Sequence, residues 1–371
     1  MDYVWGMYEK CKISPLGWEV ERLLKCRSAI QLISLISIHI FHHGLNFVRI
    51  IQQFKMQKIS IAIHGGAGTI IKEDMTPELE AEYRNALKES LDAGYAVLEI
   101  GGSAINAAKA AVVMMEDNVL FNAGRGSVFT KKGLNEMDAA IMDGSTLDAG
   151  AVAGIRNIRN PVKLAEEVML HSGHVFLSGE GANDFAIKQG IKLEPDEYFY
   201  SEYRFDQWKE IRDSDSYQLD HKSDKLGGLM KDKKFGTVGA VACDGEGNIA
   251  AATSTGGMTN KRYGRIGDSP MIGVGTYANN KTCAISCTGH GEIFIKAVAA
   301  YDVSSLMEYK NMSLHEACEE VVLKKLVALR GDGGLVGVDA KGNIAMVFNS
   351  AGMYRGFKNS DGDNLIAIYG S

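Results

Sequence analysis

The chain has little proline and no paired cysteine motif. Only 5 prolines accompany 42 glycines in 371 residues, a balance that suits tight turns and close backbone approach within sheets. Its six cysteines form no Cys-x-x-Cys pair, so their spacing does not indicate a zinc or redox site. Cys243, Cys283 and Cys287 lie in apolar runs, and we expect them to be buried free thiols of a cytoplasmic protein.

A strong charge bias and a long hydrophobic run are also missing. The net charge is −6 with 23% charged residues, which is ordinary globular composition and gives no reason to expect nucleic acid as a partner. The apolar stretch 28–41 is interrupted by Gln and His and is shorter than the roughly 20 residues that span a membrane. We therefore expect neither a nucleic acid nor a membrane partner.

Residues 1–55 differ from the rest of the chain. They are enriched in Lys and Arg, whereas the remainder is acidic, and their early acidic residues do not fit a signal peptide. Met56 precedes the first convincing strand. We interpret 1–55 as an N-terminal extension outside the fold. An amphipathic helix that packs on the body is the alternative.

Hydrophobic periodicity predicts the elements that precede residue 194. The strand 59–63 leads into the glycine-rich stretch 64–68, which lacks the spacings of phosphate-binding loops and is interpreted as a packing turn. From about 194 to 236 the pattern fails, and a long patternless segment is typically functional or a linker. The other expected elements are helices at 76–99, 103–115, 161–170 and 181–188 and strands at 127–130, 137–142 and 175–177.

The remainder of the chain reads as hairpins followed by helices. Strands at 237–244 and 248–255 flank a turn centred on Glu246, and the pattern recurs at 334–345. A further hairpin is expected at 271–277 and 282–288, with helices at 292–301 and 313–329. This segregation predicts an α+β fold in which two sheets stack and helices lie outside.

Thr237 stands where a patternless segment meets a strand. If the Gly236–Thr237 bond is cut, Thr237 carries a nucleophilic hydroxyl and a free α-amine. An α-amine has a pKa of roughly 7.7–8.0, so near neutrality it can act as a base. A threonine in that position is both nucleophile and base.

Three polar clusters follow Thr237. In the predicted register Thr255 lies opposite Thr237, where its hydroxyl can orient the new amine, although the hydroxyls of this cluster also suit an edge-strand surface. Arg265 and Asp268 either pair with each other or bind the carboxylate and ammonium of an α-amino acid. At the strand-to-helix turn 286–292, backbone N–H groups and the Thr288 hydroxyl suit an oxyanion, and His290 is a secondary candidate for a base.

These motifs together resemble the plant-type L-asparaginase and isoaspartyl peptidase family of N-terminal nucleophile hydrolases. The resemblance covers 58–371. Its motifs are IAIHGGAG at 61–68, LFNAGRGSVFT at 120–130, MDAAIMDG at 137–144, GAVAG at 150–154, GTVGAVA at 236–242, TSTGGMTNK at 253–261, GRIGDSP at 264–270 and TGHGE at 288–292.

The resemblance implies a four-layer αββα sandwich, residues 56–371, that cleaves itself after Gly236. The subunits would be 56–236, ending in a flexible linker at about 194–236, and 237–371, associated as (αβ)₂. Its implied substrates are L-asparagine and β-aspartyl dipeptides. The implied site residues are Thr237 as nucleophile, Thr255 on its amine, Arg265 and Asp268 on the substrate head group, Thr288 and Gly289 as oxyanion hole, Gly291 beside the substrate and Asn122 near the nucleophile.

No cofactor for catalysis is implied, but a structural sodium ion is. Its ligands would be backbone carbonyls of Met115, Glu116, Asn118, Phe121, Ala123 and Arg125. The resemblance also suggests that the position of His290 tunes substrate choice. Two other functions stay open: a glycosylasparaginase-type amidase, although those enzymes typically have Asp before the nucleophile, and a binding protein that keeps the fold without cleaving itself.

Overall fold

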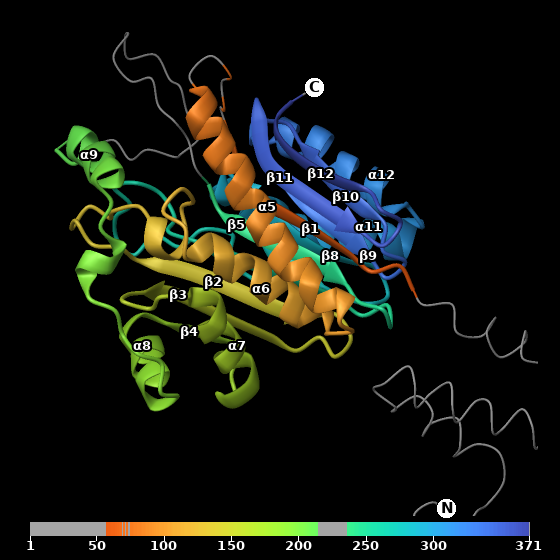
Figure 1. The fold of residues 1–371 in the computed structure, drawn as a ribbon, viewed down its shortest axis with the longest axis horizontal. Helices are drawn as coiled ribbons and strands as arrows, with labels where there is room; N and C mark the ends of the chain where they lie inside the picture. Colours follow the sequence, from red (N-terminus) through yellow and green to blue (C-terminus); the bar gives the residue numbers. More distant parts are fainter. Residues whose placement is uncertain (1–56, 69, 71, 73–74, 214–235, 371) are drawn as a thin grey trace, which may run out of the picture. The chain divides into compact units, whose positions relative to one another are not determined.

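Two β-sheets lie face to face and helices cover their outer faces (Figure 1). The computed structural model describes residues 57–68, 70, 72, 75–213 and 236–370, and every structural statement below refers to that part of the chain. The predicted extension 1–55 lies outside it. The arrangement confirms the expected αββα sandwich.

The larger sheet has eight strands in the order β12-β11-β1-β5-β6-β2-β3-β4. Its pairs are antiparallel except β3 with β4. The strands are β1 (Ser60–Gly68), β2 (Met137–Asp143), β3 (Ala149–Ile155), β4 (Phe176–Ser178), β5 (Val238–Cys243), β6 (Ile249–Thr255), β11 (Gly352–Asn359) and β12 (Asn364–Tyr369).

The smaller sheet has four antiparallel strands in the order β10-β9-β8-β7. They are β7 (Thr276–Ala278), β8 (Cys283–Gly289), β9 (Gly333–Asp339) and β10 (Ile344–Phe348). The helices are α5 (Pro77–Glu99), α6 (Ala104–Glu116), η2 (Gly124–Gly126), α7 (Pro161–His171), α8 (Gly179–Lys188), η3 (Asp196–Phe199), α9 (Glu202–Ile211), α10 (Gly291–Ala297), α11 (Ala299–Lys310), α12 (Leu314–Glu319) and the π-helical η4 (Glu320–Leu326).

Three hydrophobic cores hold the four layers together. The first lies between the larger sheet and helices α5, α6 and α7, and the second lies between the smaller sheet and helices α10, α11 and α12. The third joins the inner faces of the two sheets, and six of its thirteen buried members are alanines, among them Ala62, Ala251 and Ala284. Small side chains let two sheets approach closely, so polar groups of one sheet can reach the other.

The hairpin of β5 and β6 has the predicted register. Val238 pairs with Ser254 and Cys243 with Ile249, which centres the hairpin on Glu246. The next position toward the open end places Thr237 opposite Thr255. The structure also confirms the start of α5, where the Thr76 hydroxyl accepts a hydrogen bond from the Leu79 amide at 3.2 Å.

The glycine-rich stretch 64–68 is part of a strand, so the prediction of a turn there is wrong. Strand β1 continues to Gly68 with a bulge between His64 and Gly66, and it pairs with β11 along this stretch. Glycine permits the bulge because Gly66 adopts φ 115°.

Other boundaries also differ from the predictions. Residues 127–130 form only an isolated bridge, Phe129 to Asn135, and of 271–277 only the end is strand β7. The helix predicted at 292–301 breaks at Val298, which has φ 50°, and resumes as α11. Strands β3, β11 and β12 were not predicted.

The expectation of a patternless segment at 194–236 is wrong for residues 196–211. They form η3 and α9, because their aromatic side chains pack on the body: Phe205 and Trp208 have ring centroids 5.7 and 6.1 Å from that of Phe129. Arg204 is buried and its Nε donates to the Gly126 carbonyl at 3.1 Å. The predicted linker residues 214–235 lie outside the described part.

Candidate active site

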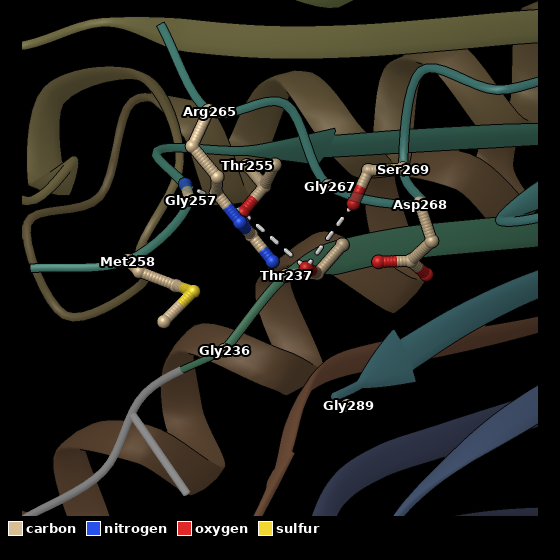
Figure 2. A pocket seen from close by; sticks show the side chains of 10 residues that line it. All are labelled: Gly236, Thr237, Thr255, Gly257, Met258, Arg265, Gly267, Asp268, Ser269 and Gly289. Atoms are coloured by element: carbon tan, nitrogen blue, oxygen red, sulfur yellow. Dashed lines mark hydrogen bonds between the residues drawn. The ribbon is translucent and has the colours of Figure 1, made fainter. Parts of the chain in front are cut away.

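Thr237 lies at the open end of the β5–β6 hairpin, with 8% of its surface exposed. Its hydroxyl donates to the Thr255 hydroxyl oxygen at 3.3 Å (Figure 2). Thr255 also accepts from the Gly257 amide at 3.0 Å, which fixes its side chain. The two predicted threonines therefore meet, and Thr255 is held in place from its other side.

Ser269 is a member of the site that sequence reasoning missed. Its hydroxyl lies 3.3 Å from that of Thr237, on the side away from Thr255 (Figure 2), and the residue is 1% exposed. The only sequence signal was its place directly after Asp268 in GRIGDSP. Thr237 Oγ1 is thus held between two hydroxyls.

Gly236 is pressed against strand β1. A Cβ placed on Gly66 would stand 2.5 Å from the Gly236 nitrogen and 2.8 Å from its Cα. A side chain on residue 66 does not fit between these two backbones, which explains the need for glycine there. The bulge of β1 therefore backs the predicted scissile bond.

Arg265 pairs with Glu292 and not with Asp268. Its Nε and Nη2 each donate to a Glu292 carboxylate oxygen at 2.9 Å, a bidentate geometry. The Arg265 side chain is 20% exposed. Because Nη1 takes no part in this pair, the guanidinium retains donors for a second carboxylate.

Asp268 is buried and its carboxylate is incompletely bonded. The residue is 3% exposed and Oδ2 has no hydrogen-bond partner among the described residues. Burial raises the pKa of this carboxyl to about 7, and the nearby Arg265 charge opposes the rise. An unpartnered buried carboxylate is a binding group for a cation such as an ammonium.

Gly291 lies between Arg265 and Asp268. A Cβ on Gly291 would stand 2.9 Å from Arg265 Nη2 and 2.9 Å from Asp268 Oδ1. Figure 2 shows Arg265 and Asp268 on opposite sides of Thr237. A cavity of about 20 Å³ remains among these groups, and it is lined by Gly236, Thr237, Thr255, Gly257, Met258, Arg265, Gly267, Asp268, Ser269 and Gly289.

Thr288 and Gly289 end strand β8 near this cavity. Gly289 lines it, whereas Thr288 is fully buried and its hydroxyl oxygen accepts from the Ala67 amide at 3.2 Å. Gly289 has φ 152°, a conformation that favours glycine. His290 faces Glu292, with its Nε2 3.7 Å from a carboxylate oxygen, and its amide donates to the Asp332 carbonyl at 3.0 Å.

Asn122 supports the site from behind. It is fully buried, its Nδ2 donates to the Gly257 carbonyl at 2.7 Å, and its Oδ1 accepts from the Val128 amide at 3.1 Å. Its own carbonyl accepts from the Gly256 amide at 2.9 Å. Asn122 thus fixes the turn after Thr255 and is not a lining residue of the cavity.

In the predicted sodium loop, two of the proposed carbonyl ligands lie close against glycines. A Cβ on Gly126 would collide with the Phe121 carbonyl oxygen, and one on Gly124 with that of Glu116. Backbone carbonyls are the hard oxygen ligands that alkali cations take. Met115, Asn118 and Ala123 accept hydrogen bonds within the loop but keep a second lone pair each. Among the described residues no three His, Cys, Asp or Glu side chains cluster as metal ligands.

Comparison with known proteins identifies the family of this chain. The model of the family described as asparaginase matches residues 56–368. The chain belongs to the asparaginase family. An isoaspartyl peptidase of Salmonella typhimurium is 50% identical over 314 residues, 85% of this chain and 99% of the relative.

Two further relatives of the asparaginase family extend the comparison. A protein of Arabidopsis thaliana described as a probable isoaspartyl peptidase/L-asparaginase 2 is 41% identical over 84% of this chain and 98% of the relative. A plant-type L-asparaginase of Pyrococcus horikoshii is 41% identical over 80% of this chain and 94% of the relative. In the described part of this asparaginase-family chain, the helices are too short or too polar to span a membrane.

Proposed function

We propose that this chain is an isoaspartyl peptidase and L-asparaginase that activates itself by cleavage between Gly236 and Thr237. The observation that carries the proposal is the position of the Thr237 hydroxyl. It lies 3.3 Å from the hydroxyls of both Thr255 and Ser269, and Thr237 stands between the Arg265 guanidinium and the Asp268 carboxylate. The names of the family relatives, isoaspartyl peptidase and L-asparaginase, support the substrate class.

The two charges select an α-amino-acid head group. Arg265 binds the α-carboxylate with its remaining donors, while Glu292 holds its orientation. Asp268 Oδ2 accepts from the α-ammonium. A substrate held in this way presents its β-carbonyl to Thr237, and this is the scissile carbonyl of both asparagine and β-aspartyl peptides.

Thr237 then supplies both nucleophile and base. Its Oγ1 attacks the β-carbonyl carbon, the hydroxyl proton passes to the free α-amine, and Thr288 and Gly289 stabilise the oxyanion. The amide nitrogen takes that proton and leaves as ammonia or as an amino acid. Water hydrolyses the aspartyl ester and releases L-aspartate.

Self-cleavage also opens the site. In the intact chain Gly236 lines the cavity, whose 20 Å³ is about the space of one water molecule. Departure of Gly236 from Thr237 enlarges the cavity for an aspartyl group. We expect subunits 56–236 and 237–371, with two copies of the pair forming (αβ)₂, which size-exclusion chromatography with light scattering measures.

Gel electrophoresis, N-terminal sequencing and product assays test this function. Wild-type protein should yield a fragment that begins at Thr237 and should release aspartate from isoaspartyl-leucine but not from α-aspartyl-leucine. Thr237→Ala should remain uncut and inactive because it lacks Oγ1, whereas Thr237→Ser should retain slow processing. A permanently intact but active chain would contradict the proposal, and an uncut, inactive wild type would favour a binding protein.

The loop 115–125 would hold a sodium ion on its backbone carbonyls and so stabilise the fold next to Asn122. The mature enzyme should then have a higher melting temperature in sodium chloride than in tetramethylammonium chloride of equal ionic strength. A cytoplasmic location stays a prediction, supported by the four described cysteines, which are buried and free.

A further inference from the structure

Four buried side chains form a continuous line that ends on the backbone carbonyl of Thr237. His64 comes from β1, Thr253 from β6, Thr276 from β7 and Ser286 from β8, and each is fully buried. Successive members of the line therefore alternate between the smaller and the larger sheet. The line begins at Thr276, whose Oγ1 lies 2.7 Å from Thr253 Oγ1, and Thr253 Oγ1 lies 2.7 Å from Ser286 Oγ. Ser286 Oγ lies 2.8 Å from His64 Nε2. The other ring nitrogen, His64 Nδ1, lies 3.0 Å from the carbonyl oxygen of Thr237.

The Thr237 carbonyl assigns the tautomer of His64 and the direction of its hydrogen bond with Ser286. A carbonyl only accepts, so His64 Nδ1 carries a proton and donates it. In the neutral imidazole, Nε2 must then accept from the Ser286 hydroxyl. The single Ser286 proton is thereby used, so the 2.7 Å contact with Thr253 requires Thr253 to donate. Thr276 donates to Thr253. Two carbonyl oxygens also lie within reach of these hydroxyls: that of Ser269 is 3.0 Å from Thr276 Oγ1, and that of Gly275 is 3.4 Å from Thr253 Oγ1.

The fold makes room for this arrangement at Gly239. A Cβ there would overlap the Ser286 hydroxyl and would stand 2.5 Å from His64 Nε2. Glycine in a strand interior has a cost of its own, and a close approach is one reason to keep it. The packing of β5 is thus adapted to the contact between His64 and Ser286.

Burial keeps the histidine neutral. It lowers the pKa of His64 to about 3, although the hydrogen bond to Thr237 opposes that change. His64 therefore remains a neutral donor throughout the pH range in which the α-amine of Thr237 acts as a base.

Thr237 has a particular need for such an anchor. Strand β5 begins only at Val238, so Thr237 precedes the ladder. After self-cleavage it becomes a chain terminus, and chain termini fray unless they are held. The Nδ1–H group of His64 holds the backbone carbonyl of Thr237, the residue that carries the nucleophilic hydroxyl.

We propose that His64 is a positioning residue that fixes the backbone of the nucleophile, and that Ser286, backed by Thr253 and Thr276, holds its other ring nitrogen. This inference rests on the proposed role of Thr237. His64 takes no proton from the substrate and does not touch the head group.

Two substitutions of His64 in the mature enzyme test the proposal. Asn offers an amide N–H near the place of Nδ1, whereas Leu fills space without a donor. We expect His64→Leu to lower kcat at least tenfold, in line with the loss of a hydrogen bond worth roughly 1.5 kcal/mol, with KM for isoaspartyl-leucine within twofold. His64→Asn should recover most of that kcat. Equal kcat in the Asn and Leu variants, or a change confined to KM, would overturn the proposal.

Ser286→Ala provides a second test if the Leu variant does not fold. It leaves His64 in place but removes the hydrogen-bond partner of Nε2, so kcat should fall by a smaller factor. The matched control is Ser90→Ala, which removes another fully buried serine hydroxyl, bonded at 2.8 Å to the Ala111 carbonyl in the outer helices. The control should leave kcat and KM unchanged. If kcat is as high in Ser286→Ala as in the control, the hydrogen bond from Ser286 does not help His64 to position Thr237, and the proposal is contradicted.

Nitrogen-15 NMR of the imidazole reads the tautomer without any turnover. In wild-type protein at pH 7, His64 should be protonated at Nδ1 and unprotonated at Nε2. Protonation at Nε2 instead would overturn the assignment. Because this readout is independent of activity, failure of the His64 assignment is distinguishable from failure of the proposed hydrolase function.

Discussion

The hydroxyl oxygens of Thr237 and Thr255 lie 3.3 Å apart at the open end of one hairpin. Their meeting depends on the register of β5 and β6, because a slip of one residue would turn the side chain of Thr255 to the opposite face of the sheet. The turn around Glu246 thus determines which hydroxyl meets that of Thr237, the proposed nucleophile.

Thr255→Val should impair turnover more than folding. Valine keeps the shape of threonine but cannot accept from the Thr237 hydroxyl or the Gly257 amide. Loss of a hydrogen bond to a group that becomes charged is worth about 1.5–3 kcal/mol, so kcat should fall by about tenfold to a hundredfold. Steady-state kinetics of the processed enzyme measures this. Thr282→Val, at another buried threonine hydroxyl, is the control, and equal kcat in the two variants would contradict the role of Thr255.

Ser269→Ala should have a smaller effect of the same kind. The Ser269 hydroxyl lies 3.3 Å from Thr237 Oγ1, and its loss removes one neutral hydrogen bond, worth about 1 kcal/mol or roughly fivefold in kcat. Self-cleavage should slow in parallel because the same oxygen attacks Gly236. A time course of cleavage on gels, together with kcat, checks this. If both rates match wild type, Ser269 is only a neighbour.

Local pattern was sufficient to predict the pair of threonines but not the groups that surround them. Thr255 followed from counting residues on each side of the turn. His64 and Ser286 are 222 residues apart and meet only because two sheets stack, so no spacing in the sequence could reveal their contact. Ser269 was overlooked because a serine beside a charged motif has no distinctive pattern.

The errors in the predicted fold also arise from contacts between segments that are distant in the sequence. Residues 196–211 carry many charges and read as a linker, yet Phe205 and Trp208 pack on Phe129 from a distant segment. Tertiary contact therefore orders a helix that its own composition does not favour. At 64–68 the glycines indicated a turn, whereas Gly66 permits the close approach of β1 to Gly236.

Glu292→Gln should weaken substrate binding without slowing the chemical step. Glu292 holds Arg265 through two 2.9 Å contacts, but its side chain is 42% exposed, so solvent screens the pair. Exposed pairs are worth about 0.2–1 kcal/mol, and we expect KM to rise up to about fivefold while kcat is unchanged. Glu320→Gln, which disrupts a surface pair with Lys324, is the matched control. A fall in kcat with constant KM would exclude this positioning role.

Asp268→Asn should stabilise the protein above neutral pH. The fold raises the pKa of Asp268 from 3.8 to about 7, so the folded state binds the proton more tightly than the unfolded state does. The stability gained from this proton is complete below the unfolded pKa and is lost as the pH rises through the folded pKa. Asparagine resembles the protonated carboxyl at every pH. The advantage of the variant in melting temperature should therefore be larger at pH 8 than at pH 5.

The same substitution should damage catalysis and change its pH profile. The profile of kcat/KM reports groups of the free enzyme, and the proposed mechanism requires both the Asp268 carboxylate and the Thr237 amine to be deprotonated. Below both pKa values, log kcat/KM of the wild type should fall with a slope of about 2, whereas Asp268→Asn should show a lower plateau and a slope of about 1 because only the amine still titrates. Arg265, Glu292 and Asp138 act electrostatically on Asp268, so profiles are compared at one ionic strength. Equal slopes in the two proteins, or a variant that melts lower than wild type at pH 8, would show that the carboxylate is not the buried ammonium-binding group described above.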